Sequence, residues 1–230
     1  MSFIIVAENT TYRYGAKIVL ENISFQISEK EKIALLGKNG SGKSTLIKAI
    51  NRLIPSYSGR ISFRFEKLRH DYPTDIYTIF SHPDEQILMN TVYSELALGL
   101  LQQGRKEEEI DAIIEKSLSY FGLLPYIHES PYCLSSGEKK KLLLATAFSL
   151  NPGILVLDEP FSNLDAKSKK ELSLYISKLD CTQIIASHEY EYIRSFCTKA
   201  FVLYNHRLFI FDRIQDILDN PSFLAEYELS

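Results

Sequence analysis

Hydrophobic and polar residues alternate along the first thirty or so positions, with turn residues between the runs. The alternation is clear in Thr10–Gly15 and again in Ile23–Ile27. A period of two is typical of strands with one buried face, so this region predicts a small antiparallel sheet. The next apolar run, Ile33–Leu36, is continuous and predicts a strand that the small sheet leads into.

The pattern changes again before residue 85. A helical stretch begins at Lys43 and ends before a predicted turn at Pro55–Gly59. Alternation over Ile61–Phe65 predicts another strand, and the apolar run Ile76–Phe80 predicts a buried one.

Between about residues 85 and 150 the apolar period becomes helical. One face of a helix is marked by residues spaced i, i+3, i+4, i+8 and i+11, namely Ile110, Ile113, Ile114, Leu118 and Phe121. Three carboxylates at Glu107–Glu109 lie near the start of this helix, where they suit its dipole and make a solvated end. The block predicts an all-helical insertion.

Strand signals return after residue 150. Ile154–Leu157 and Gln183–Ala186 read as parallel strands covered on both faces, with an amphipathic crossover helix over residues 172–179. A hairpin is predicted around Asn205–Arg207 and a last helix near Ile214–Leu218. We therefore expect an α/β fold with a mostly parallel sheet, an N-terminal antiparallel β subdomain and an inserted α-helical subdomain.

Composition narrows the possibilities. The chain has 230 residues, 45% of them hydrophobic, which suits one large domain or a domain with an inserted subdomain. A formal net charge of −3 gives no basic excess, so we expect no nucleic-acid partner.

The three cysteines, Cys133, Cys181 and Cys197, show no C-x-x-C spacing, which favours a reducing, cytoplasmic compartment. The apolar run at the N-terminus is too short for an export signal and has no basic leader. No other run approaches the roughly 18 apolar residues of a membrane-spanning helix, so we expect any membrane role to depend on another chain.

The first candidate for chemistry lies between the Ile33–Leu36 strand and the helix that follows it. The segment satisfies the phosphate-binding pattern G-x-x-x-x-G-K-[ST] in the strand, loop and helix context that it requires. Converging backbone N–H groups and a helix N-terminus would hold phosphates, Lys43 would reach the β- and γ-phosphates, and the Ser44 hydroxyl would face Mg²⁺. The predicted nucleotide-binding residues are Gly37, Lys38, Asn39, Gly40, Ser41, Gly42, Lys43, Ser44 and Thr45.

An acidic pair supplies what a phosphate loop needs to become an ATPase. Asp158 ends the apolar run Ile154–Leu157, at the edge of a parallel sheet where ligands bind. There it can hold Mg²⁺ together with Ser44. Glu159 follows and is predicted to position the attacking water or accept its proton.

Other motifs stand in a revealing order around this pair. Leu134–Glu138 precedes it, Ser162–Asp165 follows it, and His188 comes after the Gln183–Ala186 strand. With the phosphate loop, they resemble the ATP-binding cassette (ABC) ATPases, the nucleotide-hydrolysing subunits of ABC transporters, along essentially the whole chain. The resemblance identifies a P-loop NTPase core at about residues 1–84 and 151–230 and a helical subdomain at about residues 85–150, together a single ABC ATPase domain.

The resemblance also implies roles for individual residues. Leu134–Glu138 is similar to the L-S-G-G-Q signature, Asp165 belongs to the D-loop, His188 matches the switch histidine, and Tyr14 matches the aromatic residue that stacks on adenine. In this family two cassettes dock head to tail and close on ATP. The signature residues Ser135, Ser136, Gly137 and Glu138 are then expected to contact ATP held by the partner chain, at the start of a helix near Glu138.

Two positions depart from the family pattern. Ser81 stands where the family usually has a glutamine that helps to coordinate magnesium and water. Glu138 replaces the signature glutamine and Ser136 replaces a glycine. We expect the Glu138 carboxylate to be mildly unfavourable at a phosphate-facing helix start unless it turns outward.

The segment His82–Ile87 resembles the N-P-D-D-Q element of energy-coupling factor ATPases, which drive vitamin, cobalt or nickel uptake. The resemblance implies that the Ser81–Gln86 region and the helical subdomain receive a membrane subunit, at the cytoplasmic face of the cell membrane. The leading hypothesis is thus an ATP- and Mg²⁺-dependent importer ATPase that forms a homo- or heterodimer with a second cassette. The alternative is a degenerate regulatory cassette that binds ATP and dimerises with a more active partner but hydrolyses poorly. A cassette acting on ribosomes or DNA fits less well, because such chains usually carry paired cassettes or long coiled coils.

Overall fold

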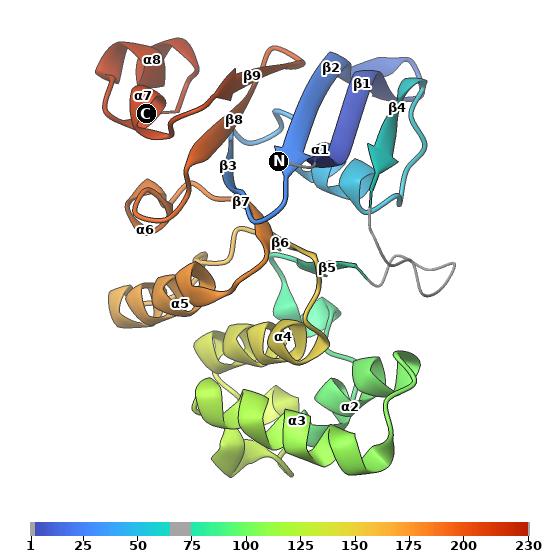
Figure 1. The fold of residues 1–230 in the computed structure, drawn as a ribbon. Coiled ribbons are helices and arrows are strands. Elements are labelled where there is room, and N and C mark those ends of the chain that lie inside the picture. Colours follow the sequence, from blue (N-terminus) through green and yellow to red (C-terminus); the bar gives the residue numbers. More distant parts are fainter. Residues whose placement is uncertain (1–2, 65–74, 230) are drawn as a thin grey trace.

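The computed structural model describes residues 3–64 and 75–229. In Figure 1, strands β1, β2 and β4 lie at one end of the molecule and helices α2, α3 and α4 at the other, with a larger sheet between them. Strands predominate before residue 80, helices follow up to residue 150, and strands return after it, as predicted; the fold is α/β.

The N-terminal sheet is antiparallel, as predicted, with strand order β2-β1-β4. Its strands are β1 (Phe3–Tyr14), β2 (Lys17–Ser28) and β4 (Ser58–Phe63). The prediction for β4 was wrong at its start, because Ser58 and Gly59 already belong to the strand. Gly59 makes this possible: a Cβ there would lie 2.3 Å from the Asn9 carbonyl oxygen, at an irregularity in the β1–β4 pairing. Phe65, the predicted end, lies outside the described residues.

The larger sheet has six strands in the order β5-β6-β7-β3-β8-β9, all parallel except the last pair. The strand bounds are β3 (Lys32–Leu36), β5 (Ile76–Ile79), β6 (Ile154–Asp158), β7 (Thr182–Ala186), β8 (Lys199–Tyr204) and β9 (Arg207–Phe211). The strand predicted at Ile76–Phe80 is present as β5, but it is buried only at Thr78 and Ile79, because β5 is an edge strand; Phe80, just after it, is 37% exposed.

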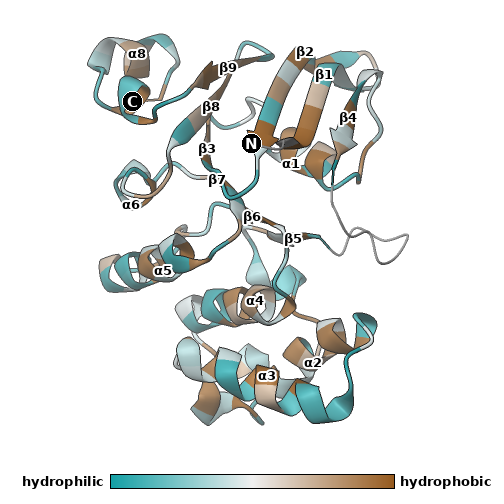
Figure 2. Ribbon diagram, in the orientation of Figure 1, coloured by the Kyte–Doolittle hydropathy of each residue, from teal (hydrophilic) through white to brown (hydrophobic). Residues whose placement is uncertain are grey.

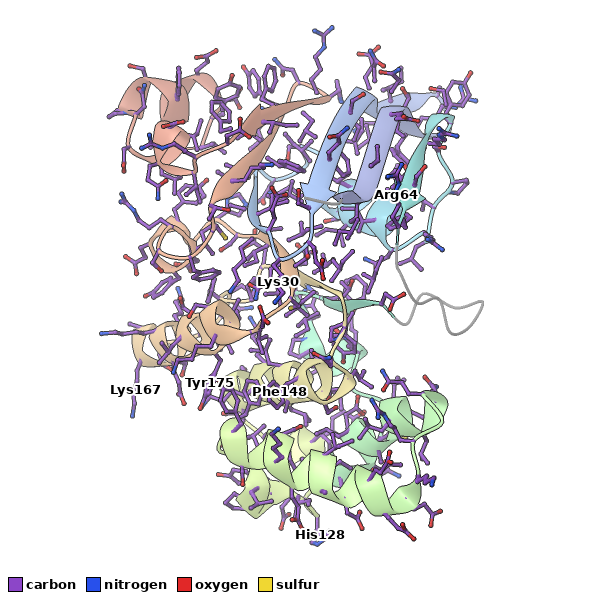
Figure 3. The ribbon with its side chains drawn as sticks, in the orientation of Figure 1. Lys30, Arg64, His128, Phe148, Lys167 and Tyr175 are labelled. Carbon is purple, nitrogen blue, oxygen red and sulfur yellow. The ribbon has the colours of Figure 1, made fainter. Side chains whose placement is uncertain are left out.

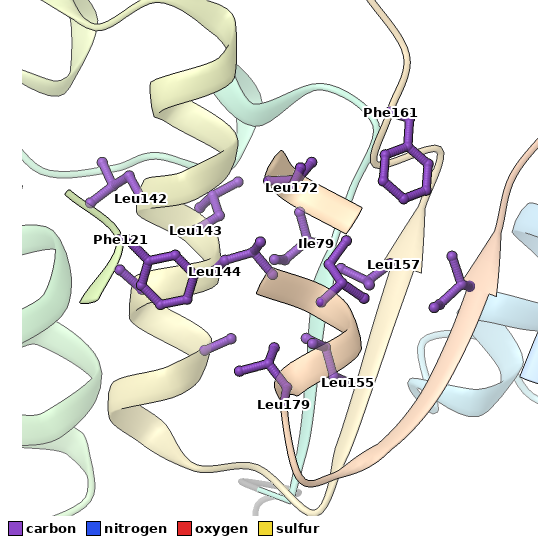
Figure 4. Packing of buried hydrophobic residues seen from close by; sticks show 14 of the residues in the cluster. Ile79, Phe121, Leu142, Leu143, Leu144, Leu155, Leu157, Phe161, Leu172 and Leu179 are labelled. Atoms are coloured by element: carbon purple, nitrogen blue, oxygen red, sulfur yellow. The ribbon is translucent and has the colours of Figure 1, made fainter. Parts of the chain in front are cut away.

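Both faces of this sheet are covered, which explains the continuous apolar runs. Along β6, Ile154 and Val156 join a core shared with the N-terminal sheet, whereas Leu155 and Leu157 join a core shared with the helices. Figure 4 shows Leu155, Leu157 and Ile79 facing side chains of α4, such as Leu144.

The segment between β5 and β6 is helical, as predicted. It contains α2 (Val92–Gln102), α3 (Glu107–Tyr120), α4 (Ser136–Leu150) and the short 3₁₀ helices η1 (Pro83–Glu85), η2 (Leu124–Tyr126) and η3 (Pro131–Cys133). Hydrophilic and hydrophobic residues alternate around α3 in Figure 2, and its apolar face is buried.

An aromatic cluster ties this helical segment to α5 (Ala166–Lys178), the crossover helix. Tyr120 stacks on Phe148 with ring centroids 5.2 Å apart, and Phe121 lies 4.8 Å from Tyr175. Figure 3 shows Phe148 of α4 and Tyr175 of α5 between their helices. The cluster therefore packs the end of α4, which carries Phe148, against α3 and α5.

The C-terminal part contains a β-hairpin and the last helices. The predicted hairpin joins β8 and β9 through Asn205 and His206, which both have positive φ, as a tight two-residue hairpin turn requires. The remaining helices are α1 (Lys43–Ile50), α6 (Tyr190–Ile193), α7 (Gln215–Leu218) and α8 (Pro221–Glu226). The three cysteines are free thiols.

Candidate functional site

The phosphate loop joins β3 to α1, as the sequence predicted. Three of its glycines have positive φ: 146° at Gly37, 80° at Gly40 and 108° at Gly42. A Cβ at Gly37 would lie 2.7 Å from the Leu203 carbonyl oxygen, and one at Gly42 would lie 2.8 Å from Leu20 Cδ2. The loop therefore needs glycine for its backbone angles and for close approach of its neighbours.

Helix α1 begins directly after this loop, at Lys43. Its N-cap is Gly42, and no side chain caps the helix. The first backbone N–H groups of a helix have no partner within it, so this N-terminus presents donors and a partial positive charge to an anion.

One cavity, of about 280 Å³, lies over the start of α1 and gathers most of the predicted site. It brings the phosphate loop together with Ser81, after β5, and with the acidic pair after β6. Its lining residues are Val19, Asn39, Gly40, Gly42, Lys43, Ser44, Thr45, Ser81, Asp158 and Glu159. Tyr14 is not among them and is 50% exposed near the end of β1, so its contact with adenine stays a prediction.

Lys43 is buried and turned toward its own loop. Its Nζ lies 2.5 Å from the Gly37 carbonyl oxygen, 3.2 Å from that of Lys38 and 3.2 Å from His188 Nε2. Burial lowers the pKa of Lys43, against the opposing charges of Glu159 and Asp158. The Lys43 ammonium thus has only uncharged partners, two carbonyl oxygens and a ring nitrogen. A negatively charged phosphate oxygen in their place would form a stronger, charge-assisted hydrogen bond.

Asp158 and Glu159 lie at the carboxyl end of β6, where the sequence placed them. Burial raises the pKa of both carboxyl groups, and Lys43 opposes the rise in each. Glu159 Oε2 accepts a hydrogen bond of 3.3 Å from the His188 backbone N–H. Its Oε1 is buried and makes no hydrogen bond within the described residues, although His188 Nε2 lies 3.4 Å away.

His188 approaches both the loop and the acid pair. Its Nε2 lies 3.2 Å from Lys43 Nζ and 3.2 Å from Asn39 Oδ1. Burial and the Lys43 charge lower the pKa of His188, so the ring is neutral at pH 7. Nε2 can then accept a hydrogen bond from the Lys43 ammonium. The sequence prediction that this histidine belongs to the phosphate site is consistent with its position.

The residues present fit a nucleoside triphosphate with a magnesium ion. Three buried side-chain oxygens have no hydrogen-bond partner in the part of the chain that the structure describes, and two of them, Ser41 Oγ and Glu159 Oε1, belong to the phosphate loop and the acidic pair; the third is Gln183 Oε1. Buried polar atoms of this kind are usually satisfied, so they mark a place for further polar atoms. No group of three or more His, Cys, Asp or Glu in residues 3–64 and 75–229 could hold a metal alone. Mg²⁺, which is typically held by one or two protein oxygens and phosphates, suits Ser44 and Asp158.

The signature segment lies at the start of α4, and one expectation for it was wrong, because the Glu138 carboxylate is favourable there. The helix begins at Ser136, two residues before Glu138 and so near it as expected, with Ser135 as its N-cap. Glu138 folds back: its Oε2 accepts from the Ser135 N–H at 2.8 Å and from the Ser135 hydroxyl at 2.6 Å. This capping box makes Glu138 favourable at the helix start, and the hydrogen bonds from Ser135 lower the pKa of Glu138.

The D-loop residues Ser162–Asp165 lead into α5, beside the signature. Asp165 is the N-cap of α5 and accepts from the backbone N–H groups of Lys167 at 2.9 Å and Ser168 at 3.0 Å. Gly137 faces the same place, because a Cβ there would lie 3.5 Å from Ser168 Oγ. The signature and the D-loop are therefore neighbours, while neither lines the cavity of its own chain.

The segment after β5 is held by its own side chains. Gln86 accepts from the Phe80 N–H at 3.1 Å and donates to the Thr78 carbonyl oxygen at 2.7 Å. It therefore closes the end of β5 rather than reaching the cavity. Ser81, at the position of the expected glutamine, does line the cavity.

Sequence reasoning missed two residues near the site. Val19 lines the cavity from β2, but its position in an alternating strand carries no signal of that role. Lys140 reaches the backbone of the Glu159 turn from α4, and it stands in a run of three lysines that reads as a solvated surface. Within the described residues, no helix is both long and apolar enough to cross a membrane.

Comparison with known proteins gives a consistent result. The model of the ABC transporter family matches residues 20–162. A putative ABC transporter ATP-binding protein of Clostridium acetobutylicum is 34% identical, with 95% of this chain and 97% of that protein covered. An energy-coupling factor transporter ATP-binding protein of Acetivibrio thermocellus is 31% identical, with coverage of 93% and 79%.

A solved structure agrees with these relatives. It is that of cbiO1 from Clostridium perfringens, part of the ABC transporter complex cbiONQ. It matches with a TM-score of 0.85 at 27% identity and covers 100% of this chain and 96% of that one. The similarity therefore extends over both sheets and the helical segment.

Proposed function

The chain belongs to the ABC transporter family as an ATP-binding, ATP-hydrolysing subunit, and from that premise we propose that it energises a membrane importer of the energy-coupling type. The observation that carries the proposal is that one cavity is lined by Lys43, Ser44, Asp158 and Glu159 together. Membership in the family establishes that the chain binds and hydrolyses ATP. The importer, its type and the role of each residue are our proposals.

ATP binding begins with the phosphates at the N-terminus of α1. The loop's backbone N–H groups surround them, and Lys43 turns from the Gly37 and Lys38 carbonyl oxygens to the β- and γ-phosphates. Tyr14 stacks on the adenine. Ser44 and Asp158 hold Mg²⁺, which neutralises phosphate charge when bound.

Hydrolysis then needs a base near the γ-phosphate. Glu159 Oε1 is buried and free of hydrogen bonds within the described residues, so it can accept one from a water molecule. As the water oxygen forms its bond to the γ-phosphorus, its proton passes to Glu159, and the bond to the β,γ-bridging oxygen breaks to give ADP and phosphate. We infer that neutral His188 contacts the γ-phosphate, and its Nε2, 3.2 Å from Lys43 Nζ, supports this.

Motion comes from a pair of cassettes. We infer a head-to-tail dimer in which the Ser135–Glu138 signature and the D-loop at Asp165 face the ATP bound by the partner chain. Ser135 and Ser136 are exposed at the start of α4, which supports this assignment. ATP closes the pair, and loss of the γ-phosphate opens it.

The membrane subunit docks on the Ser81–Gln86 region and the helical subdomain, at the cytoplasmic face of the membrane. Exposed apolar side chains here support this: Leu88 is 67% exposed, and Tyr132, whose hydroxyl lies 3.4 Å from the Ile87 carbonyl oxygen, is 56% exposed. In this proposal residues 1–84 and 151–230 form the core of one domain and residues 85–150 form the part that meets the membrane subunit.

A second candidate is a regulatory cassette that binds ATP, dimerises and hydrolyses poorly. Two observations favour it. Ser81 replaces the expected glutamine at the cavity, and the Ser135 hydroxyl already donates to Glu138.

Single-turnover hydrolysis by the purified chain, alone and mixed with a second cassette, separates the two candidates. The importer ATPase predicts hydrolysis of ATP bound to this chain in at least one of these samples. Absence of turnover in both, with ATP binding intact, would favour the regulatory cassette. Co-purification from membranes followed by identification of the associated chains tests the membrane subunit, and its absence would contradict the docking proposal.

A further inference from the structure

Three consecutive lysines occupy the first turns of α4, and each reaches a different element. Lys139 Nζ lies 2.6 Å from Asp84 Oδ1 in η1, and Lys141 Nζ lies 2.7 Å from Glu171 Oε1 in α5. Lys140 turns instead toward main-chain oxygens after β6. The lysine run is therefore not a uniform solvated surface, and its middle member differs from its neighbours.

Lys140 is buried, with 4% of its surface exposed. Its Nζ donates to the Ser162 carbonyl oxygen at 2.6 Å and lies 3.4 Å from the Glu159 carbonyl oxygen. The Ser162 hydroxyl, 3.3 Å from Lys140 Nζ, donates to the same Glu159 carbonyl at 2.9 Å. Burying an ammonium is costly unless hydrogen bonds compensate, so these contacts hold Lys140 firmly at this turn.

The charges around Lys140 act in opposite directions. Burial lowers the pKa of Lys140 to about 8, while the Glu159 charge raises it and the Lys169 charge lowers it further. Lys169, on α5, is itself paired with Glu189. The ammonium form therefore predominates at pH 7.

The turn that Lys140 holds has an unusual backbone. Glu159 has φ of 50°, in the left-handed region that residues other than glycine rarely adopt. Its N–H donates to the Ala186 carbonyl oxygen at 2.8 Å, and its own carbonyl oxygen faces Ser162 and Lys140. A strained residue persists only when its surroundings hold it, so the direction of the Glu159 carboxylate depends on these contacts.

We propose that Lys140 is a positioning residue that holds the Glu159 turn in its reactive conformation and ties it to helix α4. The inference rests on the proposed role of Glu159 as the base. Lys140 is one turn beyond the signature that faces the partner's ATP, and it contacts Ser162, the first D-loop residue. Lys140 thereby joins the helix that carries the signature to the turn that carries Glu159.

Two variants and a matched control test this. Lys140→Met keeps roughly the length of the side chain but removes its hydrogen-bond donors, whereas Lys140→Arg keeps the positive charge and the donors. The control, Lys141→Met, removes a neighbouring lysine that pairs with Glu171 of α5. We expect Lys140→Met to lower kcat roughly 10- to 100-fold with little change in KM for ATP, because a misplaced catalytic group costs rate rather than binding. Lys140→Arg should recover much of this loss, and Lys141→Met should retain wild-type kcat.

A second measurement does not depend on hydrolysis. Hydrogen–deuterium exchange without nucleotide should be faster over residues 159–165 in Lys140→Met than in Lys141→Met. Wild-type kcat in Lys140→Met, or no recovery in a folded Lys140→Arg, would overturn the proposal. So would unchanged exchange over residues 159–165. If the wild-type chain shows no turnover at all, the proposed function fails, while the exchange comparison still decides whether Lys140 holds the turn.

Discussion

The phosphate loop and the start of α4 are both turns that open a helix facing ATP in the proposed dimer, yet they differ in how the first helical N–H groups are used. Helix α1 has Gly42 as its N-cap and no side-chain cap. Helix α4 has a capping box between Ser135 and Glu138. The first helix start leaves its donors open to a ligand, whereas the second satisfies part of them within its own chain.

This difference suggests that the two helix starts differ in how readily they bind a phosphate group. An open helix start with a buried lysine binds phosphate whenever ATP is present. A helix start that already holds its own carboxylate has hydrogen bonds to exchange before it can meet the partner's γ-phosphate. In the proposed dimer, the loop would thus be the stronger nucleotide contact of this chain, and hydrogen bonds at the start of α4 would have to change on closure.

Among changes at the two helix starts, the largest expected effect comes from removing the charge at the open one. Lys43→Ala deletes the ammonium that reaches the β- and γ-phosphates, so we expect hydrolysis to fall by about 10²–10³-fold or more. ATP affinity, measured by equilibrium dialysis, should fall as well. Lys48→Ala is the control, because Lys48 lies exposed in the last turn of the same helix. Equal rates of hydrolysis by Lys43→Ala and Lys48→Ala would contradict the proposed contact between Lys43 and the phosphates of ATP.

A smaller effect tests the backbone of the loop. Gly37→Ala places a Cβ 2.5 Å from Ser41 Oγ and 2.7 Å from the Leu203 carbonyl oxygen, at a positive φ. We expect the free energy of unfolding to fall by about 1–3 kcal/mol, as measured in urea. In Gly40→Ala the new Cβ meets nothing within 4 Å, so only the backbone angle costs energy and the loss should be smaller. The reverse order would contradict the packing described for Gly37.

The helix cap of α4 should contribute less. Glu138→Ala removes the acceptor for the Ser135 N–H and hydroxyl, and we expect a loss of about 0.3–1 kcal/mol in the free energy of unfolding. The hydrogen bonds lower the pKa of Glu138 from its ordinary value of 4.5. The contribution is therefore present above pH 4.5 and lost as the pH falls through the lower folded value. A stability difference from wild type that grows on acidification would show that the cap is not formed.

The smallest effect is a pH dependence at Lys140. Because the pKa of Lys140 is about 8, its ammonium is charged below that pH and neutral above it. The wild-type kcat should fall relative to that of Lys140→Arg as the pH rises through about 8, since arginine keeps its charge. A ratio of the two kcat values that stays constant from pH 7 to pH 9 would mean that the charge does not help to hold the Glu159 turn.

The sequence predicted those parts of the molecule whose causes are local. The glycine pattern at Gly37–Thr45 and the apolar run before Asp158 report backbone angles and burial directly, and both were placed correctly. The Glu138 carboxylate was wrongly expected to be unfavourable, because its capping box with Ser135 depends on the side-chain conformation at the start of α4. Lys140 was missed because its partners, Glu159 and Ser162, are distant in sequence and are main-chain groups with no side-chain signal of their own.

The most direct test of the account is single-turnover ATP hydrolysis by Glu159→Gln beside the wild-type chain, with ATP binding and dimer formation measured on the same samples. The account predicts that the variant binds ATP as the wild type does, accumulates as a closed dimer and loses hydrolysis by roughly 10²–10⁴-fold, the usual contribution of a positioned base. Hydrolysis at the wild-type rate would show that Glu159 is not the base, and the mechanism built on this cavity would be wrong.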